Sequence, residues 1–484
     1  MADRRPNILL FFTDQQRFDT IRALGNPIIR TPVLDDLVAR GTAFTRAYTP
    51  SPVCVSARCA LVTGTEPRVN GCSDNMPMDM GRTSLMQMLS GAGYATHGVG
   101  KMHFEPDSRG LWGFDSRVYC EECNADDDFR AYLDAHGYDH VRDPHGVRSE
   151  YYYLPQPSQL PARHHATTFC VDRSIDWLRA RDRSAPFFLF TSIIKPHPPF
   201  EAPTPWNKLY RASDMPLPKL PPHHEQLLTY WNRYQNRYKW RDQGCDENLL
   251  RTMKAAYYAC ISFIDYQLGR LLEELDQQRQ LDNTLILFTS DHGELLGDYG
   301  SFGKRCMLDS AARIPLLAVW PERFAAGARC AEPTSLIDIL PTCLSAAGVD
   351  TLPEHSGVDL AALAGGEVRR EAVHTQFQAA GQAVYLRATA DTKYIWSAPD
   401  QREWLLDSAH DPEETVDRAG NPRYAARLSE QREATLAHFA DTPGVTEGRW
   451  TEYPTRHLAP QRDAHLLYQD HPSSTVLPDP RYAP

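Results

Sequence analysis

Three runs of almost uninterrupted apolar residues constrain the fold of this chain more than any other feature. They occupy positions 7–14 (NILLFFTD), 187–194 (FFLFTSII) and 284–290 (TLILFTS). A strand that is apolar on both faces must be covered on both faces, which is typical of parallel sheets. Segments with helical apolar spacing lie between these runs, notably 32–40 and 253–276. Helices that alternate with buried strands predict an α/β fold, a mostly parallel sheet sandwiched by helices.

Polar residues directly follow four of the predicted strands. These strands are the runs at 7–14, 187–194 and 284–290 and a shorter run at 95–99. The residues after them are Asp14 and Gln15, Lys101 and His103, Lys195 and His197, and Asp291 and His292. Because ligands bind beyond the carboxyl ends of strands in such sheets, we expect one functional site at this edge. A further strand is predicted at 313–321.

Charge and hydropathy exclude two classes of function. The net charge is −11, the pI is near 5.9, and no dense stripe of Lys and Arg occurs, so nucleic-acid binding is not expected. No run approaches the ~20 apolar residues of a membrane span. The apolar stretch 8–12 is too short for a signal peptide, so we expect a cytoplasmic protein with no membrane partner.

The cysteines do not form a recognisable framework. There are eleven, an odd number without regular spacing, which favours free thiols in a reducing compartment. Cys120 and Cys123 form an isolated CxxC, and a structural zinc ion requires four ligands, so we expect no zinc there.

The sequence predicts three parts. Residues 1–375 carry the α/β pattern, and residues 376–444 combine alternating segments with one helix near 423–440, which predicts a small antiparallel α+β subdomain. Residues 445–484 are rich in Pro, Arg and Tyr and lack periodicity, although they include Trp450, Leu466 and Leu467. Such a tail is disordered, folds back on its own subunit or packs on another surface. We expect it to pack on a second copy and give a homo-oligomer, a dimer or tetramer.

One cysteine stands in a distinctive context. In SPVCVSARCALVTGTEP (51–67), Cys54 precedes a predicted helix and Arg58 follows one turn later. A free cysteine is usually a small buried side chain, but this segment resembles the sulfatase signature C-x-[P/A]-x-R followed by T-G. Other stretches resemble the same family in the same order: NILLFFTDQQ, GKMHF (100–104), KPHPPF (195–200), SDHGELLGDYG (290–300) and Lys304. Ser56 departs from the usual Pro or Ala, which bears on how efficiently Cys54 is modified.

The whole pattern, over roughly residues 5–440, resembles formylglycine-dependent sulfatases of the alkaline-phosphatase-like α/β fold, with residues 1–375 as the catalytic domain. The resemblance implies that a formylglycine-generating enzyme oxidises Cys54 and that the hydrated aldehyde supplies the nucleophilic oxygen. A sulfated diol can expel sulfate by breaking its own C–O bond, which splits one difficult step into two. A helix start also favours a sulfate anion. We expect Cys54 at a rim rather than in a core.

The resemblance also implies a site for one divalent cation. Its ligands would be Asp14, Gln15, Asp291 and His292, together with the oxygen that replaces the Cys54 sulfur. Many members of the family have Asp and Asn where Gln15 and His292 stand, whereas choline sulfatases and phosphonate monoester hydrolases share the pattern seen here. This ligand set is compatible with Ca²⁺ or Mg²⁺, and the imidazole adds Mn²⁺.

The remaining site residues are implied by the same motifs. Arg58, Lys101 and Lys304 would surround the formylglycine and the sulfate oxygens, and His103 would pair with the diol. His197 would contact the ester oxygen and protonate the leaving alcohol, since an imidazole exchanges protons near neutral pH. Asn75 would reach the substrate.

The leading interpretation is therefore a metal-dependent sulfuric ester hydrolase. Hydrolysis of phosphonate monoesters or phosphodiesters is the alternative, because the same site accommodates tetrahedral phosphorus. A non-catalytic binding protein of the same fold would have lost Cys54 or a metal ligand, and none is lost. The alcohol half of the substrate is open. Aromatic and cationic residues in 145–165 favour a sulfated carbohydrate over choline sulfate or an aryl sulfate.

Overall fold

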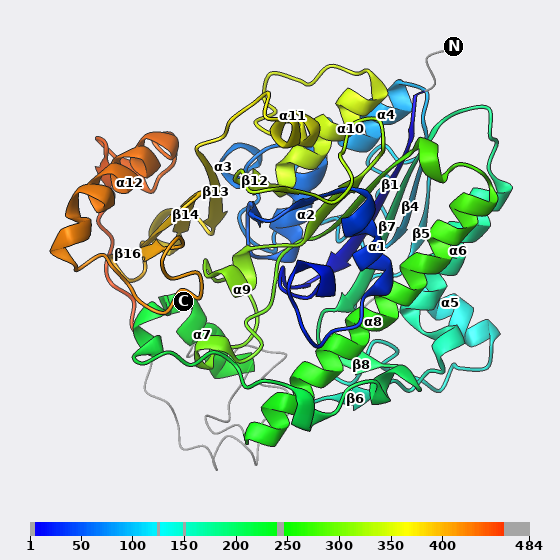
Figure 1. Cartoon of the computed structure of the whole chain (residues 1–484), viewed down its shortest axis with the longest axis horizontal. Coiled ribbons are helices and arrows are strands. Elements are labelled where there is room, and N and C mark those ends of the chain that lie inside the picture. The colour runs from blue at the N-terminus through cyan, green and yellow to red at the C-terminus, as the bar shows by residue number, and fades with distance from the viewer. Residues whose placement is uncertain (1–4, 123–125, 149–151, 240–245, 459–484) are drawn as a thin grey trace.

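A central sheet of eight strands organises the computed structural model, which describes residues 5–122, 126–148, 152–239 and 246–458 (Figure 1). The strand order is β11-β2-β10-β9-β1-β7-β4-β5. The bounds are β1 Asn7–Asp14, β2 Thr42–Phe44, β4 Ala95–Gly100, β5 Ser116–Tyr119, β7 Phe187–Pro196, β9 Thr284–Ser290, β10 Leu316–Val319 and β11 Ala328–Cys330. The fold is the alkaline-phosphatase-like α/β sandwich that the sequence predicts.

The five strands from β9 to β5 run parallel, with β1 between β7 and β9. Strand β10 is shorter than its predicted segment 313–321 and runs antiparallel to β9 and β2. The connection from β9 to β10 contains a 3-10 turn at Asp298–Gly300 and the four-residue helix α9 (Asp309–Ala312), and neither is long enough to cross the sheet. Parallel neighbours need a long crossover, so the chain re-enters the sheet from the edge at which β9 ends.

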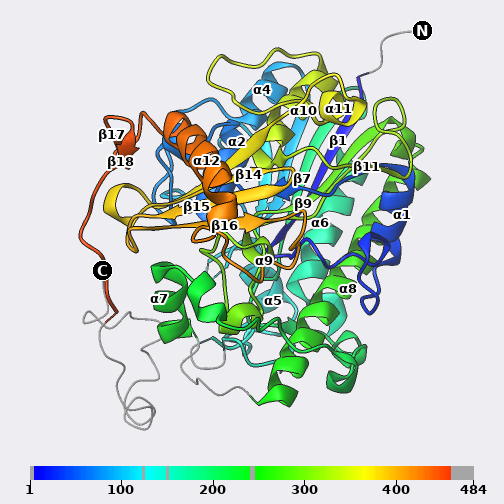
Figure 2. The same cartoon turned by 60° about the vertical axis from the view of Figure 1, so that its left-hand side comes forward.

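Helices cover both faces of the sheet (Figures 1 and 2). Alternate residues of β1 divide between two cores: Leu9 and Phe11 pack on one side, and Ile8, Leu10 and Phe12 on the other. One face is covered by α1 (Pro32–Arg40), α5 (Asp128–Ala135), α6 (Ala166–Ala180) and α8 (Glu247–Gln277). The opposite face is covered by α2 (Cys54–Thr63), α4 (Leu85–Gly91), α10 (Ile339–Ala347) and α11 (Leu360–Gly365). Shorter elements are β3 Ala47–Tyr48, α3 Pro67–Asn70, β6 Gln156–Pro157, β8 Glu201–Ala202, α7 Tyr230–Lys239 and β12 Thr334–Ser335.

A second sheet is antiparallel and carries one helix, as the alternating segments after residue 376 predict. It contains β13 (Ala372–Phe377), β14 (Val384–Thr389), β15 (Thr392–Ser397) and β16 (Arg402–Asp407), followed by α12 (Ala425–His438). Its first strand touches the segment that leads to Cys54. Thr375 Oγ1 donates to Thr49 O at 2.6 Å, and Gln376 N donates to Pro50 O at 2.9 Å.

The first residues of the predicted tail fold against this second sheet. Strands β17 (Val445–Thr446) and β18 (Arg449–Trp450) pair with each other, and Trp450 stacks on Trp396 and Tyr385. Leu466 and Leu467 lie outside the described residues. The described part of the tail therefore packs Trp450 on its own subunit, and a homo-oligomer stays a prediction.

The nine described cysteines are free and buried. Cys120 is one of them, whereas Cys123 of the CxxC lies outside the described residues. Among the described helices, none combines the length and apolar character needed to cross a membrane.

Candidate active site

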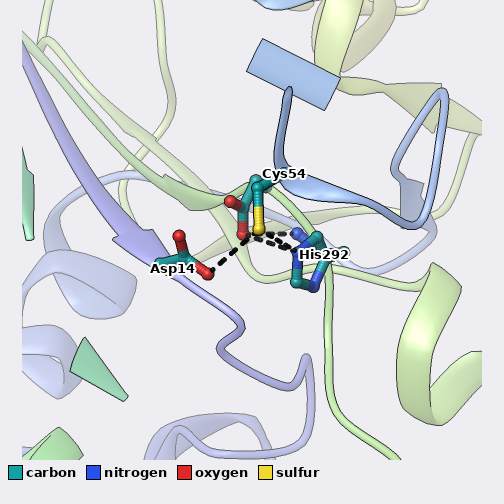
Figure 3. A group of neighbouring side chains, drawn as sticks. Asp14, Cys54 and His292 are labelled. Carbon is teal, nitrogen blue, oxygen red and sulfur yellow. Dashed lines mark hydrogen bonds and ion pairs between the residues drawn. The ribbon is translucent and has the colours of Figure 1, made fainter. Parts of the chain in front are cut away.

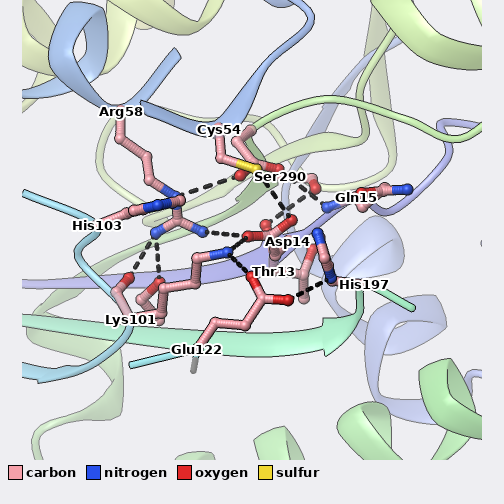
Figure 4. Close-up of polar contacts among 12 residues, drawn as sticks. Thr13, Asp14, Gln15, Cys54, Arg58, Lys101, His103, Glu122, His197 and Ser290 are labelled. Atoms are coloured by element: carbon pink, nitrogen blue, oxygen red, sulfur yellow. Dashed lines mark hydrogen bonds and ion pairs between the residues drawn. The ribbon is translucent and has the colours of Figure 1, made fainter. Parts of the chain in front are cut away.

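The ends of β1, β4, β7 and β9 bring polar side chains together at one edge of the central sheet (Figure 4). The register between β1 and β7 shifts between Thr13 and Asp14, where the chain leaves the sheet. Gln15 then adopts a positive φ of 68°, which is uncommon for a residue with a side chain. Tyr257 Oη donates to Gln15 O at 2.6 Å and stabilises this turn. Local strain of this kind concentrates at functional sites.

Cys54 is the first residue of α2, and several charged groups contact its sulfur atom (Figure 3). Lys304 Nζ lies 2.6 Å from Sγ, His292 Nε2 lies 3.3 Å away, and Asp14 Oδ1 lies 3.7 Å away. Burial and Asp14 raise the pKa of the thiol. Lys304, Lys101 and His292 together lower it more, so that this pKa lies well below its ordinary value. The position is not the expected rim, because Cys54 is only 1% exposed and every residue of α2 is buried.

Three side chains form, together with that sulfur, a group that could hold a metal ion. The ligand atoms of Asp14, Cys54, Asp291 and His292 all lie within 4.8 Å of one another, and all four residues are buried. The carbonyl oxygen of Gly293 can only accept, so His292 Nδ1, 2.9 Å away, carries the proton and Nε2 is free to bind. Carboxylates and one imidazole fit a divalent cation.

Gln15 adds a second, independent observation. Its Oε1 atom is buried and has no hydrogen-bond partner, which is costly for an amide oxygen. Its Nε2 donates to Glu294 Oε2, and Glu294 Oε1 in turn accepts from the backbone N–H of Leu296 and Gly303. Glu294 therefore fixes the amide so that its oxygen is available, and a cation would satisfy that oxygen.

This arrangement predicts that Glu294→Gln weakens metal binding although it replaces none of the proposed ligands. The new amide must present an N–H₂ group either to Gln15 Nε2 or to the two backbone N–H groups, so the Gln15 orientation is lost. We expect a fall in affinity of about 10–100-fold, as for other partners that orient ligands. Titration calorimetry with Mn²⁺ and Ca²⁺ measures it. Glu273→Gln, on the exposed side of α8, is the matched control, and equal affinities in both variants would contradict the role of Glu294.

The two carboxylates differ in their surroundings. Asp291 Oδ1 accepts from the backbone N–H of Gln15 and of His292, both at 2.9 Å. Burial and the neighbouring Asp14 raise the pKa of Asp291. Burial also raises the pKa of Asp14, but Lys101 and the other cations around it outweigh burial and hold that pKa well below its ordinary value. Asp14 is thus the carboxylate on which the positive charges of the site converge.

Arg58 holds the two carboxylates rather than reaching toward a ligand. Its Nε donates to Asp291 Oδ2 and its Nη2 to Asp14 Oδ2, both at 3.2 Å. Nη1 donates to Lys101 O at 2.5 Å and to Ser192 Oγ at 2.9 Å. Four of its five N–H groups are therefore committed within the protein. Its effect on a bound anion would come mainly through charge and through the positions of Asp14 and Asp291.

Lys101 and His197 share a partner that the sequence reasoning missed. Lys101 Nζ donates to Asp14 Oδ2 at 2.6 Å and to Glu122 Oε2 at 2.8 Å. His197 Nδ1 lies 3.0 Å from Glu122 Oε1 and 2.8 Å from Pro198 O. Glu122 lies within the CxxC segment Cys120–Cys123, and no local sequence pattern distinguishes it from an exposed carboxylate.

The other predicted residues are placed as follows. Asn75 is exposed, and its Oδ1 accepts from the backbone N–H of Val55, in the first turn of α2, at 3.2 Å. His103 lies beside Arg58, and its Nδ1 has no hydrogen-bond partner (Figure 4). Lys195 is turned away from the site and donates to the carbonyl oxygens of His145 at 2.9 Å and Pro199 at 2.8 Å. Of the residues that follow the four strands, Lys195 is therefore a structural residue.

Comparison with known proteins agrees with this arrangement. A model of the sulfatase family matches residues 6–349, and a model of the C-terminal region of N-sulphoglucosamine sulphohydrolase matches residues 297–440. The chain is 29% identical to an arylsulfatase of Clostridium perfringens, over 98% of this chain and 99% of that protein. It is 30% identical to a choline-sulfatase of Rhizobium meliloti, over 94% of this chain and 92% of that protein.

Among solved structures, the chain is similar to the phosphonate monoester hydrolase of Agrobacterium radiobacter. The TM-score is 0.79 at 26% identity, with 90% of this chain and 96% of that chain covered. The family model covers most of the chain, including β1, α2 and β9, whose ends carry Asp14, Cys54 and Asp291. The chain belongs to the sulfatase family, and it is a sulfuric ester hydrolase.

Proposed function

We propose that the protein hydrolyses sulfate esters with a formylglycine made from Cys54 as the nucleophile and one divalent cation beside it. The observation that carries this proposal is the convergence on a single buried sulfur of a lysine ammonium, an imidazole nitrogen and a carboxylate. A structural thiol gains nothing from such neighbours, whereas a nucleophile beside a cation site requires them.

Each absent group supplies one kind of chemistry. A divalent cation held by Asp14, Gln15, Asp291 and His292 would place positive charge beside the ester and lower the cost of ionising a neighbouring hydroxyl. Formylglycine at position 54 would supply that hydroxyl as its hydrate.

The residues of the chain itself account for binding and proton transfer. Lys101 and Lys304 are almost completely buried cations: Lys304 contacts the Cys54 sulfur and Lys101 contacts Asp14 beside it, where both can hold sulfate oxygens. Charge-assisted hydrogen bonds of this kind are the strong ones, particularly away from water. Arg58 keeps both carboxylates in place. His103, with an unpartnered Nδ1, is the proposed base near position 54.

His197 is the proposed proton donor to the leaving alcohol. Pro198 O can only accept at Nδ1, so this atom carries a proton, and Glu122 Oε1 lies 3.0 Å away as an ion-pair partner. Burial lowers the pKa of His197 well below its ordinary value, and Lys304 and Lys101 lower it further. A bound anion has the opposite effect, so the imidazole would gain its proton together with the substrate.

Two measurements test this proposal. After co-expression with a formylglycine-generating enzyme, mass spectrometry of the peptide that contains Cys54 should show conversion of the thiol to the aldehyde. The modified protein should then hydrolyse 4-nitrophenyl sulfate and lose this activity on chelation. Full sulfatase activity from a peptide that is still a thiol would contradict the proposed nucleophile.

Hydrolysis of phosphonate monoesters is the second candidate. It is favoured by Gln15 and His292 at the metal group and by the likeness to a phosphonate monoester hydrolase. Values of kcat/KM for 4-nitrophenyl sulfate and 4-nitrophenyl phenylphosphonate separate the two activities. The larger value identifies the substrate class.

A sulfated saccharide is the alcohol class that we propose. A cavity of about 650 Å³ is lined mainly by charged side chains, among them Asp127, Arg142 and Arg148. Arg148 forms an ion pair with Glu122, which connects the cavity to Lys101 and His197. Paired acids and guanidinium groups suit a hydroxyl-rich ligand better than an apolar one. A panel of sulfated mono- and oligosaccharides, with an aryl sulfate for reference, tests this assignment.

A further inference from the structure

The mechanism above assigns one charged residue at the reaction centre no role toward the substrate. Glu122 follows β5, and its side chain is only 10% exposed. Each of its carboxylate oxygens lies beside a site residue: Oε2 accepts from Lys101 Nζ at 2.8 Å, and Oε1 lies 3.0 Å from His197 Nδ1 (Figure 4). Arg148 forms an ion pair with Oε1.

These partners are the groups assigned to the substrate. Lys101 is placed to hold a sulfate oxygen, and His197 is placed at the ester oxygen. Only the side chains of Lys101 and His197 therefore separate Glu122 from the position at which the transferred group must bind. A carboxylate so close to an anion-binding site repels the bound anion, so its charge affects which anions bind.

Cations and carboxylates alternate among the described side chains nearest position 54. Arg58, Lys101 and Lys304 face the carboxylates of Asp14, Asp291 and Glu122, and Arg148 adds a fourth cation at Glu122. Lys101 divides its ammonium between two of those carboxylates, at 2.6 and 2.8 Å. Glu122 thus uses part of the positive charge that a second negative charge on the substrate would need.

We propose that Glu122 selects the charge of the substrate, so that the site accepts transferred groups with one negative charge and disfavours those with two. Sulfate esters and phosphonate monoesters carry one charge, whereas a phosphate monoester carries two above its second pKa of about 6. This inference rests on the proposed function, because it concerns the anion that Lys101 and His197 bind. Like charges held in contact away from water oppose binding strongly.

Glu122→Gln removes the charge and keeps the shape. Its amide oxygen can still accept from Lys101, so the loop retains that contact. We measure kcat/KM at pH 8 for 4-nitrophenyl sulfate, 4-nitrophenyl phenylphosphonate and 4-nitrophenyl phosphate. The ratio of the phosphate value to the sulfate value should rise at least about tenfold, while the ratio between the two singly charged esters should stay within about twofold.

A binding experiment gives the same information without turnover. Benzenesulfonate and phenylphosphonate have nearly the same shape, and at pH 8 they carry one and two charges. Calorimetric Kd values for the metal-loaded protein should favour benzenesulfonate in the wild type, and this preference should shrink about tenfold in Glu122→Gln. Asp126→Asn, which removes an exposed carboxylate four positions away, is the matched control and should leave the preference unchanged.

The outcomes separate the two proposals. If both probes bind and their Kd ratio is the same in Glu122→Gln, then Glu122 is only a structural residue and the inference is overturned. If the ratio shifts but no ester is hydrolysed, the inference holds and the proposed function fails. If neither probe binds, both are wrong. Thermal unfolding confirms that Glu122→Gln folds, and Glu122→Ala replaces it if it does not.

Discussion

Cys54→Ala should lose at least about 10³-fold in kcat/KM toward any ester that the protein hydrolyses, because a nucleophile has no substitute within the site. The substitution removes the atom on which Lys304, His292 and Asp14 converge. It also leaves the Lys304 ammonium without its 2.6 Å partner in a buried position. Rates with 4-nitrophenyl sulfate and 4-nitrophenyl phenylphosphonate measure the loss.

The control for this variant is another small buried thiol. Cys343 lies in α10, in the core on the same face of the sheet as α2, and burial raises its pKa, the opposite of the shift at Cys54. Cys343→Ala should cost some stability through a small cavity and leave the rate nearly unchanged. Wild-type rates in Cys54→Ala would refute the assignment of this residue as the nucleophile.

Asp291→Asn should weaken metal binding by at least about 100-fold and reduce activity in proportion, since it removes one of the two carboxylates in the ligand group. Asparagine can still accept the N–H groups of Gln15 and His292 with its oxygen. Its N–H₂ group then faces Arg58 Nε, donor against donor, where Asp291 Oδ2 now accepts at 3.2 Å. Calorimetry with Mn²⁺ and Ca²⁺, and rates before and after chelation, check the expectation.

Asp265→Asn provides a matched comparison. Asp265 is also a buried aspartate that accepts from two backbone N–H groups, but it lies in α8 and its donors, Val33 and Leu34, are in the first turn of α1. Both variants should lose stability, about 1–3 kcal/mol for a disturbed buried acceptor, while only Asp291→Asn should lose the metal. Activity in Asp291→Asn that survives exhaustive chelation would rule out the metal assignment.

The elements that the sequence predicted best are the strands that are buried on both faces. The runs at 7–14 and 284–290 match β1 and β9 because such a strand has no polar face that could mislead the assignment. The direction of β10 was not predictable, because an apolar run carries no information about which edge of the sheet the chain enters. Cys54 was expected at a rim, yet CVSARCALVT is mostly apolar all round, which is typical of a helix without a solvent face.

Residues that act through three-dimensional neighbours were harder to predict. Asp14, Asp291 and His292 follow strands, so the fold class alone places them together. Glu122 acquires its meaning only when Lys101, His197 and Arg148 arrive from three other segments. Lys195 shows the reverse error. It follows the predicted strand 187–194 but lies inside β7, and its ammonium donates to the backbone carbonyls of His145 and Pro199 instead of reaching the site.

The contact between β13 and the segment before Cys54 has a consequence for biosynthesis. Thr375 holds Thr49 from 326 positions further along the chain, and Lys304 reaches the sulfur from 250 positions further along. At a translation rate of about 5–20 residues per second, the ribosome needs roughly 16–65 s to make Thr375 after it has made Thr49. Cys54 is 1% exposed once the fold is complete. If Cys54 is oxidised as proposed, the oxidising enzyme needs to reach it before the C-terminal half of the chain completes the fold around it.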